Sequence, residues 1–406
     1  MAQTPPGPGA RAPPSLPSHL IEEILVRVAT PRDLARASAA CATFRRLVAD
    51  ASFLRRYRSL HPPLLLGLID RPFSFTPAEA PHLNAPAAAT LARAADFSFE
   101  CLGPRGLLGW FHCDARDGRV LLMCPSPPGG PLLPELAVCD PLTRGHTLLP
   151  PIPDRLVPSS VCVPAREELV DCFHAFFVPS GDYEDTQFRV ICWPHWVPSA
   201  FLYSSLSGTW TAGTTANWDA LGLNVHPEED IPQPSSLPSY AYGCFYWKES
   251  ATNKLLKLDV NRMEFSAVSL PPNHENRQIV VVEAAGEGNI GILSRIPGQE
   301  IPHNLRYSIR QNEGEISNEH PMETTIPLPS DYERYFVVAA AEEYILLLGS
   351  RSISRRGSGV FREGSLAFFT LEIKTLKIEK VCSTCSICGR ILPYFGFPPF
   401  MSPRRI

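Results

Sequence analysis

The segment KLLKLDVNRMEFSAVSLPP, residues 254–272, decides the fold of most of this chain. An apolar strand comes first, a turn containing Asp259 and Asn261 follows, and a second strand runs into Pro271 and Pro272. Two short apolar runs separated by turn-forming residues are typical of a β-hairpin, and proline is tolerated at strand ends. The segment therefore predicts a pair of antiparallel strands.

The same pattern recurs along the chain at a regular spacing. It is found as LAVCDPLTRGHTLLPPIP (136–153), AFLYSSLSGTWTAG (200–213) and LAFFTLEIKTLKIEKV (366–381), with a degenerate copy within 305–329. Apolar partner strands lie between the copies: DGRVLLM, QFRVICW, YGCFYW, IVVVEAAGEGNIGIL and YFVVAAAEEYILLL. Successive turns are roughly 50 to 65 residues apart, the period expected for four-stranded propeller blades with some long loops.

We therefore predict a mostly β domain over residues 96–395, a β-propeller of five to seven blades, of which five hairpin pairs are recognisable. The 43 prolines agree with many short strands and exclude a protein built from long helices. A pair of β-sandwiches or an irregular β domain is the alternative, because the copies share a pattern rather than a sequence.

A different pattern occupies residues 15–60. Leu20, Ile24 and Val28 recur every four residues with Ile21 and Leu25 beside them, which predicts an amphipathic helix. The run Thr30-Pro31-Arg32-Asp33 then has the features of a helix start, because Thr can cap, Pro suits the first position and Asp completes a capping box.

Two more helices are expected in this region. A single apolar stripe spaced 3, 4, 3 and 4 predicts one continuous second helix with Leu34, Ala37, Cys41, Phe44 and Val48. A third short helix, with Phe53, Leu54, Tyr57 and Leu60, is expected to end before Pro62 and Pro63. About 45 residues are close to the lower limit for an independent core. We expect apolar surface to remain uncovered, which usually marks a docking site.

These patterns divide the chain into five parts. We expect a disordered Pro/Gly/Ala-rich tail over 1–14, a three-helix domain over 15–60, a linker over 61–95, the propeller over 96–395 and a C-terminal tail over 396–406. The predicted class is an α+β multidomain protein.

Composition narrows the choice of partners and compartment. The chain has 406 residues, a net charge of −4 and 12 scattered cysteines. This charge offers no basis for nucleic acid or an anionic membrane as main partner, and we find neither a membrane-spanning run nor a secretory leader. We expect a protein of the cytosol or nucleus in which the cysteines are reduced, buried thiols.

Two motifs raise the question of a cofactor or a metal. GEGNIG (286–291) has the GxGxxG spacing, but Pro297 follows too soon for the helix that would receive a pyrophosphate, so we predict a hairpin turn. In CSTCSIC, Cys385 would face away from Cys382 and Cys388 on a strand, and no fourth zinc ligand is near. We expect no cofactor and no metal, and a final-blade strand with small buried thiols.

The sequence also lacks the familiar catalytic motifs. GxSxG, HExxH and a P-loop are absent, and the eleven histidines are scattered. His112, beside Cys113, and His195, in WPHWVP, are interpreted as structural or loop residues. We expect no catalytic residues and a protein that is not an enzyme.

Residues 15–54, SLPSHLIEEILVRVATPRDLARASAACATFRRLVADASFL, resemble an F-box. The resemblance rests on Leu16-Pro17, the apolar pairs of the first helix, Asp33-Leu34 at the start of the second, and Phe44-Arg45 with Leu47-Val48. The remainder is similar to the F-box-associated β-propellers of plant proteins. Phe44 stands where that family usually has Trp, and Ala42 where Lys is common.

This resemblance implies a function. In the family, the F-box docks on the Skp-type adaptor of an SCF-type, cullin-based ubiquitin ligase, while the C-terminal domain holds a substrate protein for ubiquitination. The residues expected to form or support the adaptor-facing surface are Leu16, Pro17, Leu20, Ile24, Leu25, Leu34, Cys41, Phe44, Leu47 and Val48. Substrate-binding residues are not predictable, because propeller specificity lies in loop side chains.

Two alternatives remain open. The propeller could be an enzyme or a small-molecule binder without a ligase role, which would require convergent titratable groups or metal ligands at the central channel. The chain could also be an F-box protein that binds the adaptor but works outside the ligase.

Overall fold

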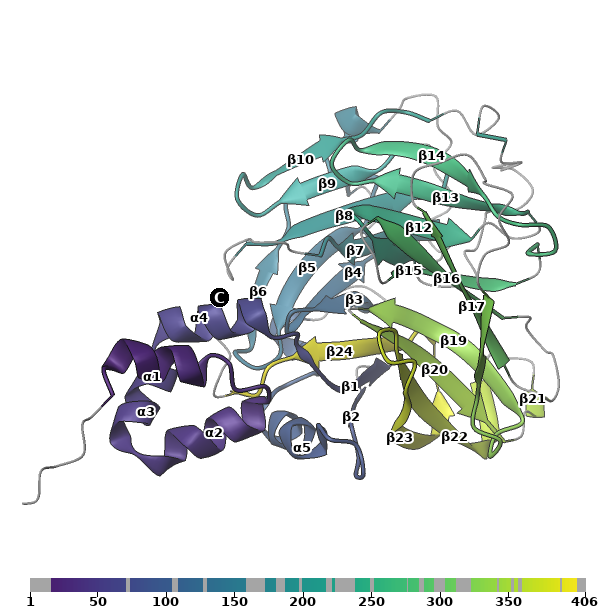
Figure 1. The fold of residues 1–406 in the computed structure, drawn as a ribbon. Helices are drawn as coiled ribbons and strands as arrows, with labels where there is room; N and C mark the ends of the chain where they lie inside the picture. The colour runs from purple at the N-terminus through teal and green to yellow at the C-terminus, as the bar shows by residue number, and fades with distance from the viewer. Residues whose placement is uncertain are drawn as a thin grey trace, which may run out of the picture. The chain divides into compact units, whose positions relative to one another are not determined.

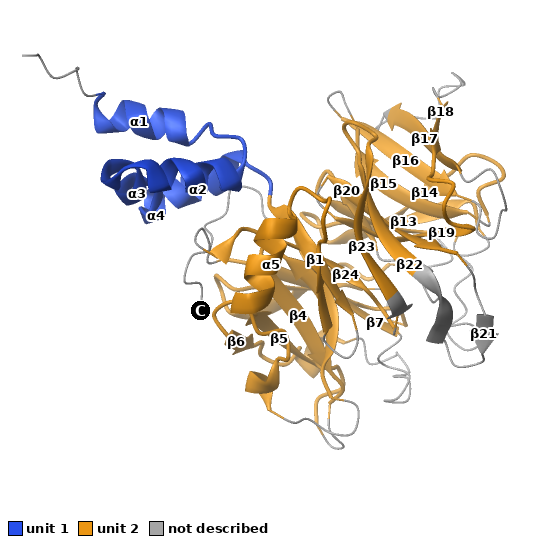
Figure 2. Ribbon diagram, turned by 90° about the horizontal axis from the view of Figure 1, so that it is seen from below, with its two compact units in different colours: residues 1–62 blue, residues 63–406 orange. Residues whose placement is uncertain are grey.

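The computed structural model describes most of residues 16–399. The residues within that span that it does not describe are 71–73, 104–108, 127–129, 158–171, 180–186, 197–198, 217–220, 223–237, 249–251, 276, 285–287, 296–303, 312–322, 342, 352–353, 357–359 and 388. The predicted tail over 1–14 and most of the one over 396–406 also lie outside the described residues. The chain forms two compact units, residues 1–62 and 63–406 (Figure 2).

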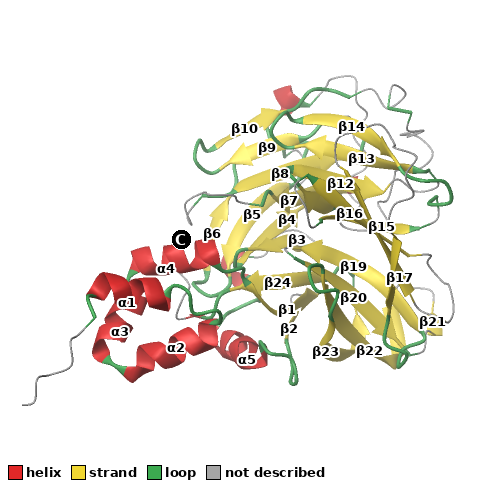
Figure 3. Cartoon of the chain, viewed as in Figure 1, coloured by secondary structure: helices red, strands yellow, loops and turns green. Residues whose placement is uncertain are grey.

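Four helices form the first unit (Figure 3): α1 (Ser18–Leu25), α2 (Pro31–Ala40), α3 (Ala42–Val48) and α4 (Ala51–Leu60). The predicted start of α2 is confirmed, because the Asp33 N–H donates to the Thr30 hydroxyl at 3.1 Å and Pro31 is the first helical residue. Asp50 caps α4 by accepting hydrogen bonds from the N–H groups of Ser52 (2.8 Å) and Phe53 (3.3 Å).

The prediction of one continuous second helix is wrong. Cys41 has extended backbone angles, φ −154° and ψ 160°, and it separates α2 from α3. Its Sγ accepts the Phe44 N–H at 3.4 Å and so acts as the N-cap of α3. A one-residue break leaves the apolar spacing unchanged, so periodicity alone could not locate it.

The second unit is a β-propeller of six blades (Figure 1). Five blades follow one another along the chain, as β3–β6, β7–β10, β11–β14, β15–β18 and β19–β23. The strands of the first three are β3 (Phe111–Arg116), β4 (Arg119–Cys124), β5 (Glu135–Asp140), β6 (Gly145–Leu148), β7 (Phe173–Phe177), β8 (Arg189–Pro194), β9 (Phe201–Ser204), β10 (Thr209–Ala212), β11 (Ser239–Ala241), β12 (Cys244–Lys248), β13 (Lys254–Asp259) and β14 (Glu264–Ser269).

The next two blades contain longer strands. These are β15 (Gln278–Glu283), β16 (Asn289–Arg295), β17 (Asn304–Gln311), β18 (Glu323–Pro327), β19 (Arg334–Ala341), β20 (Tyr344–Ser350), β21 (Ser354–Arg356), β22 (Val360–Glu372) and β23 (Ile378–Ile387). All the predicted hairpins are confirmed, including β13–β14 from the opening segment and the degenerate β17–β18. The last three residues of GEGNIG, 289–291, begin β16, where Ile290 pairs with Glu283 of β15, while residues 286 and 287 lie outside the described residues.

The sixth blade joins the two ends of the propeller unit. In it β24 (Leu392–Gly396) pairs with β1 (Leu64–Asp70), which pairs with β2 (Ser74–Pro77). β24 lies next to β3 and to β19, the first strands of the neighbouring blades. Six blades lie within the predicted range of five to seven. Hairpins revealed only five of them, because β24 is more than 300 residues from β1 in the chain.

The prediction of a linker over 61–95 is wrong. Residues 63–95 belong to the propeller unit and contribute β1, β2 and the helix α5 (Ala85–Ala94), which packs on both strands, whereas residues 61 and 62 belong to the helical unit. Two short 3₁₀ helices, Glu100–Leu102 and Asp154–Leu156, complete the described elements.

Apolar side chains between blades make up the core. Trp193 of β8 and Trp247 of β12 meet with ring centroids 4.8 Å apart, so aromatic rings join two neighbouring blades. Among the residues the structure describes, no helix has the length and apolar character that a membrane span requires.

Candidate protein-docking site

Exposed apolar side chains lie on α1 and just before it: Leu20 and Ile24 are on the helix, and Leu16 is two residues before its first residue. Leu16, Leu20 and Ile24 are 55%, 42% and 56% exposed, although each is a large aliphatic residue. A spacing of four residues places such side chains in one row along a helix. We call these three residues the α1 row.

The other side of α1 faces the interior of the helical unit. Leu25 and Val26 are buried and Ile21 is half-buried. The helix is therefore apolar on both sides, and only one side is covered within the unit. Large apolar side chains exposed in a row are typical of a surface that meets another protein.

Buried polar contacts fix the orientation of α1. The Tyr57 hydroxyl of α4 donates to the Val28 carbonyl oxygen at 2.8 Å, and His61 Nε2 lies 2.8 Å from the Val26 carbonyl oxygen. The Tyr57 and His61 rings stack with centroids 4.0 Å apart. Burial, with a smaller effect from the charge of Asp33, raises the pKa of Tyr57 to about 12, so the hydroxyl remains a donor.

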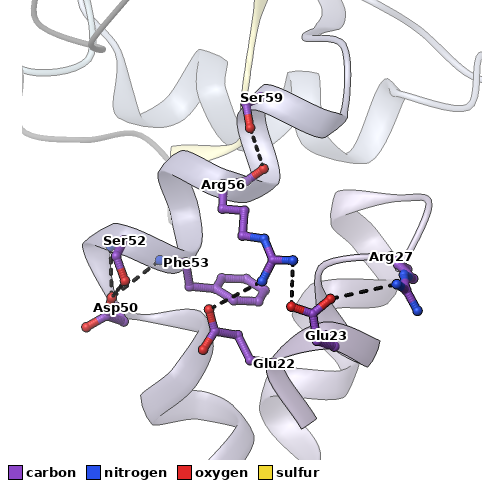
Figure 4. A network of polar contacts seen from close by, with 8 residues as sticks. All are labelled: Glu22, Glu23, Arg27, Asp50, Ser52, Phe53, Arg56 and Ser59. Atoms are coloured by element: carbon purple, nitrogen blue, oxygen red, sulfur yellow. Dashed lines mark hydrogen bonds and ion pairs between the residues drawn. The ribbon is translucent and has the colours of Figure 1, made fainter. Parts of the chain in front are cut away.

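An ion-pair network on the surface also joins α4 to α1 (Figure 4). The Arg56 guanidinium lies 2.6 Å from Glu23 and 3.9 Å from Glu22, and Arg27 lies 3.7 Å from Glu23. These side chains are about a third to three quarters exposed, so solvent screens the pairs and each adds little stability. Their role is to favour one orientation of α1 against α4.

The ten residues predicted for the adaptor-facing surface differ in exposure. Leu16, Pro17, Leu20, Ile24 and Cys41 are exposed, Phe44 and Leu47 are half-buried, and Leu25, Leu34 and Val48 are buried. The exposed members can contact a partner directly. The three buried residues can only support the surface from below.

Sequence reasoning missed the polar contacts of Tyr57, which it placed only in an apolar stripe. The usable signal was the residue type, because a buried tyrosine usually finds a partner for its hydroxyl. The charge of the helical unit was also overlooked. Residues 16–62 contain eight arginines and four acidic residues, whereas the whole chain is negatively charged.

The cysteine-rich segment gives no metal site among the residues the structure describes. Cys382 is buried in β23, and burial raises the pKa of its thiol to about 12. Cys388 and the side chain of Cys385 lie outside the described residues. No group of three or more His, Cys, Asp or Glu side chains in the described part of the chain is placed to hold a metal.

Comparison with known proteins identifies no family for this chain. No family model and no curated protein matches this sequence. Similar solved structures include TolB from Acinetobacter baumannii (11% identity, TM-score 0.35, covering 76% of this chain and 61% of TolB) and YjhT (11%, 0.35, 69% and 86%). A chain of the nidogen/laminin complex is also similar (8%, 0.31, 69% and 81%).

These similarities carry no argument about activity, since their identities and TM-scores are low. The chain spans less than two thirds of the length of TolB.

Proposed function

We propose that this protein is a substrate-recognition adaptor of an SCF-type cullin ubiquitin ligase. In this proposal the helical unit is an F-box that docks on the Skp-type adaptor, and the propeller binds a substrate protein. The single observation that carries the proposal is the α1 row, which is exposed at the position where the F-box resemblance puts the adaptor contact.

The charge of the helical unit adds a constraint on the partner. Eight arginines against four acidic residues between 16 and 62 give this unit a net positive charge. Arg45, Arg46 and Arg55 are exposed on α3 and α4. A partner with an acidic surface around an apolar groove would associate faster than a neutral one.

The mechanism requires no chemistry by this chain. Holding a substrate next to an activated ubiquitin raises the effective concentration of the acceptor lysine. The propeller loops would select the substrate, and the conjugating enzyme held by the ligase would supply the reactive thioester. The protein would work in the cytosol or nucleus without a cofactor.

A paired substitution tests the docking face. Leu20→Asp combined with Ile24→Asp places two charges on the α1 row and should abolish co-purification with the Skp-type adaptor. The matched control is Leu83→Asp combined with Leu206→Asp, because these propeller leucines are 67% and 75% exposed and lie outside the helical unit. Unchanged co-purification of the first variant, or equal loss in the control, would contradict the proposal.

Affinity purification under proteasome inhibition separates the ligase role from its alternative. Recovery of both adaptor and cullin supports a ligase subunit, and the remaining proteins are candidate substrates. Recovery of the adaptor without cullin would favour an F-box protein that works outside the ligase.

A further inference from the structure

Three side chains from distant parts of the propeller form a chain of contacts. His195 Nε2 lies 3.1 Å from His174 Nδ1, and Arg390 Nη2 lies 3.5 Å from His174 Nε2. His174 is on β7, an inner strand next to β3, and His195 directly follows β8. Arg390 precedes β24, the strand that closes the ring.

A fourth residue holds the same segment from the neighbouring blade. His112 Nε2, on β3, lies 2.7 Å from the backbone carbonyl oxygen of Arg390. Arg390 therefore contacts a histidine of β3 and a histidine of β7. β24 itself makes a separate contact, in which the Tyr394 hydroxyl donates to the Gly118 carbonyl oxygen at 3.0 Å.

The contacts allow one arrangement of protons. A guanidinium can only donate, so His174 Nε2 must accept from Arg390. The neutral His174 ring then carries its hydrogen on Nδ1 and donates it to His195 Nε2. Adding a proton to His174 would turn an N–H toward the Arg390 guanidinium. A protonated His195 would donate from Nε2 to His174 Nδ1. The hydrogen of His174 would then lie on Nε2 and face the Arg390 guanidinium.

The surroundings resist such a charge. His174 and His195 are 4% and 1% exposed, and the Phe176 and Trp193 rings lie against them. Burial, the neighbouring His195 and the Arg390 charge lower the pKa of His174 well below its usual value.

Among the described residues, the charged and titratable groups near this chain of contacts come from β3 and from the segment before β24. They include His112, Asp114 and Arg116 on β3 and Arg390 itself. The Asp114 carboxylate accepts N–H hydrogen bonds from Phe177 (2.8 Å) and Ala115 (2.9 Å), and burial raises its pKa. Because the folded pKa of Asp114 is raised, its protonation favours the closed state as pH falls, which is opposite to the effect expected of the histidines.

We propose that His174, His195 and Arg390, together with His112, form a proton-sensitive latch on the closing blade, and that acidification releases the segment before β24 from β3 and β7 and loosens β24. The fold makes this release consequential, because β24 is the innermost strand of the only described blade built from both ends of the propeller unit. Release would open the ring and loosen the domain at acidic pH. The proposal concerns the propeller alone and does not depend on the adaptor role.

Hydrogen–deuterium exchange on the full-length protein tests the latch. Exchange at pH 5.5 and 7.5 is compared after correction for the intrinsic rate, in peptides that cover β24 and, as an internal reference, β13. A histidine that is neutral in the closed state and has an ordinary pKa of about 6.5 when released favours opening about tenfold at pH 5.5. We expect at least that increase in β24 and none in β13.

Variants assign the response to the histidines. His174→Gln combined with His195→Gln keeps an acceptor for Arg390 and removes both titrating rings, so the pH response of β24 should disappear. His146→Gln, at an exposed position on β6, should retain it. A wild-type β24 that exchanges equally at both pH values would overturn the proposal. So would a uniform increase in all blades, or a response retained by the double variant, which would assign it to groups other than His174 and His195.

Discussion

The Tyr57 hydroxyl donates to the Val28 carbonyl oxygen at 2.8 Å and thereby ties α4 to the segment that follows α1. Tyr57 is fully buried, and its ring fills the space beside Phe53 and His61. This contact sets which side of α1 faces inward. The exposure of the α1 row therefore depends on a residue on a different helix.

Tyr57→Phe should destabilise the helical unit by about 1–2 kcal/mol, because it leaves a carbonyl oxygen without its buried donor. Native-state hydrogen exchange of α1 and α4 in the full-length protein measures this free energy without assuming that both units unfold together. Exchange in β13 should not change. Equal protection of α1 in the variant would show that Tyr57 does not position this helix.

Asp50→Ala should increase hydrogen exchange in α4 several-fold, because it removes the N-cap of this helix. Hydrogen bonds from Ser52 and Phe53 lower the pKa of Asp50, so its stabilising effect is present above the unfolded pKa of about 3.9 and is lost as pH falls through the folded value. Asp50→Asn keeps the cap and should remove this acid dependence. Hydrogen exchange of α4 between pH 3 and 6 checks both variants.

Gly67→Ala should destabilise the closing blade by about 1–3 kcal/mol. A Cβ at Gly67 would overlap the Thr76 carbonyl oxygen and lie 2.7 Å from the Phe75 ring, next to the bulge in the β1–β24 pairing. Gly396→Ala is the matched control on β24, since its Cβ would have no neighbour nearer than 3.6 Å. Exchange of β1 and β24 should increase in the first variant only.

Buried thiols should be unreactive in the folded protein. Burial raises the pKa of Cys139 and Cys382 to about 12, whereas Cys41 and Cys101 are exposed. Iodoacetamide at pH 8 should label the exposed pair at least about tenfold faster, because the thiolate is the reactive form. Peptide mass spectrometry reads the rates, and rapid labelling of Cys382 before unfolding would contradict its placement in β23.

Local patterns predicted most of the fold. The hairpins were recognisable because turn residues and alternating apolar runs lie within about 20 residues of one another. The closing blade was missed because β1 and β24 pair across almost the whole propeller unit, and no local pattern records such a pairing. Cys41 was placed inside a helix because one extended residue does not disturb helical spacing.

The candidate site was predicted in part. The spacing of Leu20 and Ile24 indicated an apolar face, but it could not show which residues turn outward. In the structure, Leu25 and Val26 are buried, whereas Leu20 and Ile24 are exposed. Tyr57 and His61 contact the carbonyl oxygens of Val28 and Val26, next to the buried pair. The histidines of the latch lie on β3, on β7 and directly after β8, so no local pattern groups them.

Titration calorimetry of the full-length protein with a purified Skp-type adaptor tests the central claim most directly. The account predicts saturable one-to-one binding that Leu20→Asp combined with Ile24→Asp weakens at least about 100-fold, because two buried aliphatic contacts are worth about 3 kcal/mol or more. Leu83→Asp combined with Leu206→Asp should bind like the wild type. Absence of binding by the wild-type protein, or unchanged binding by the α1 variant, would contradict the account.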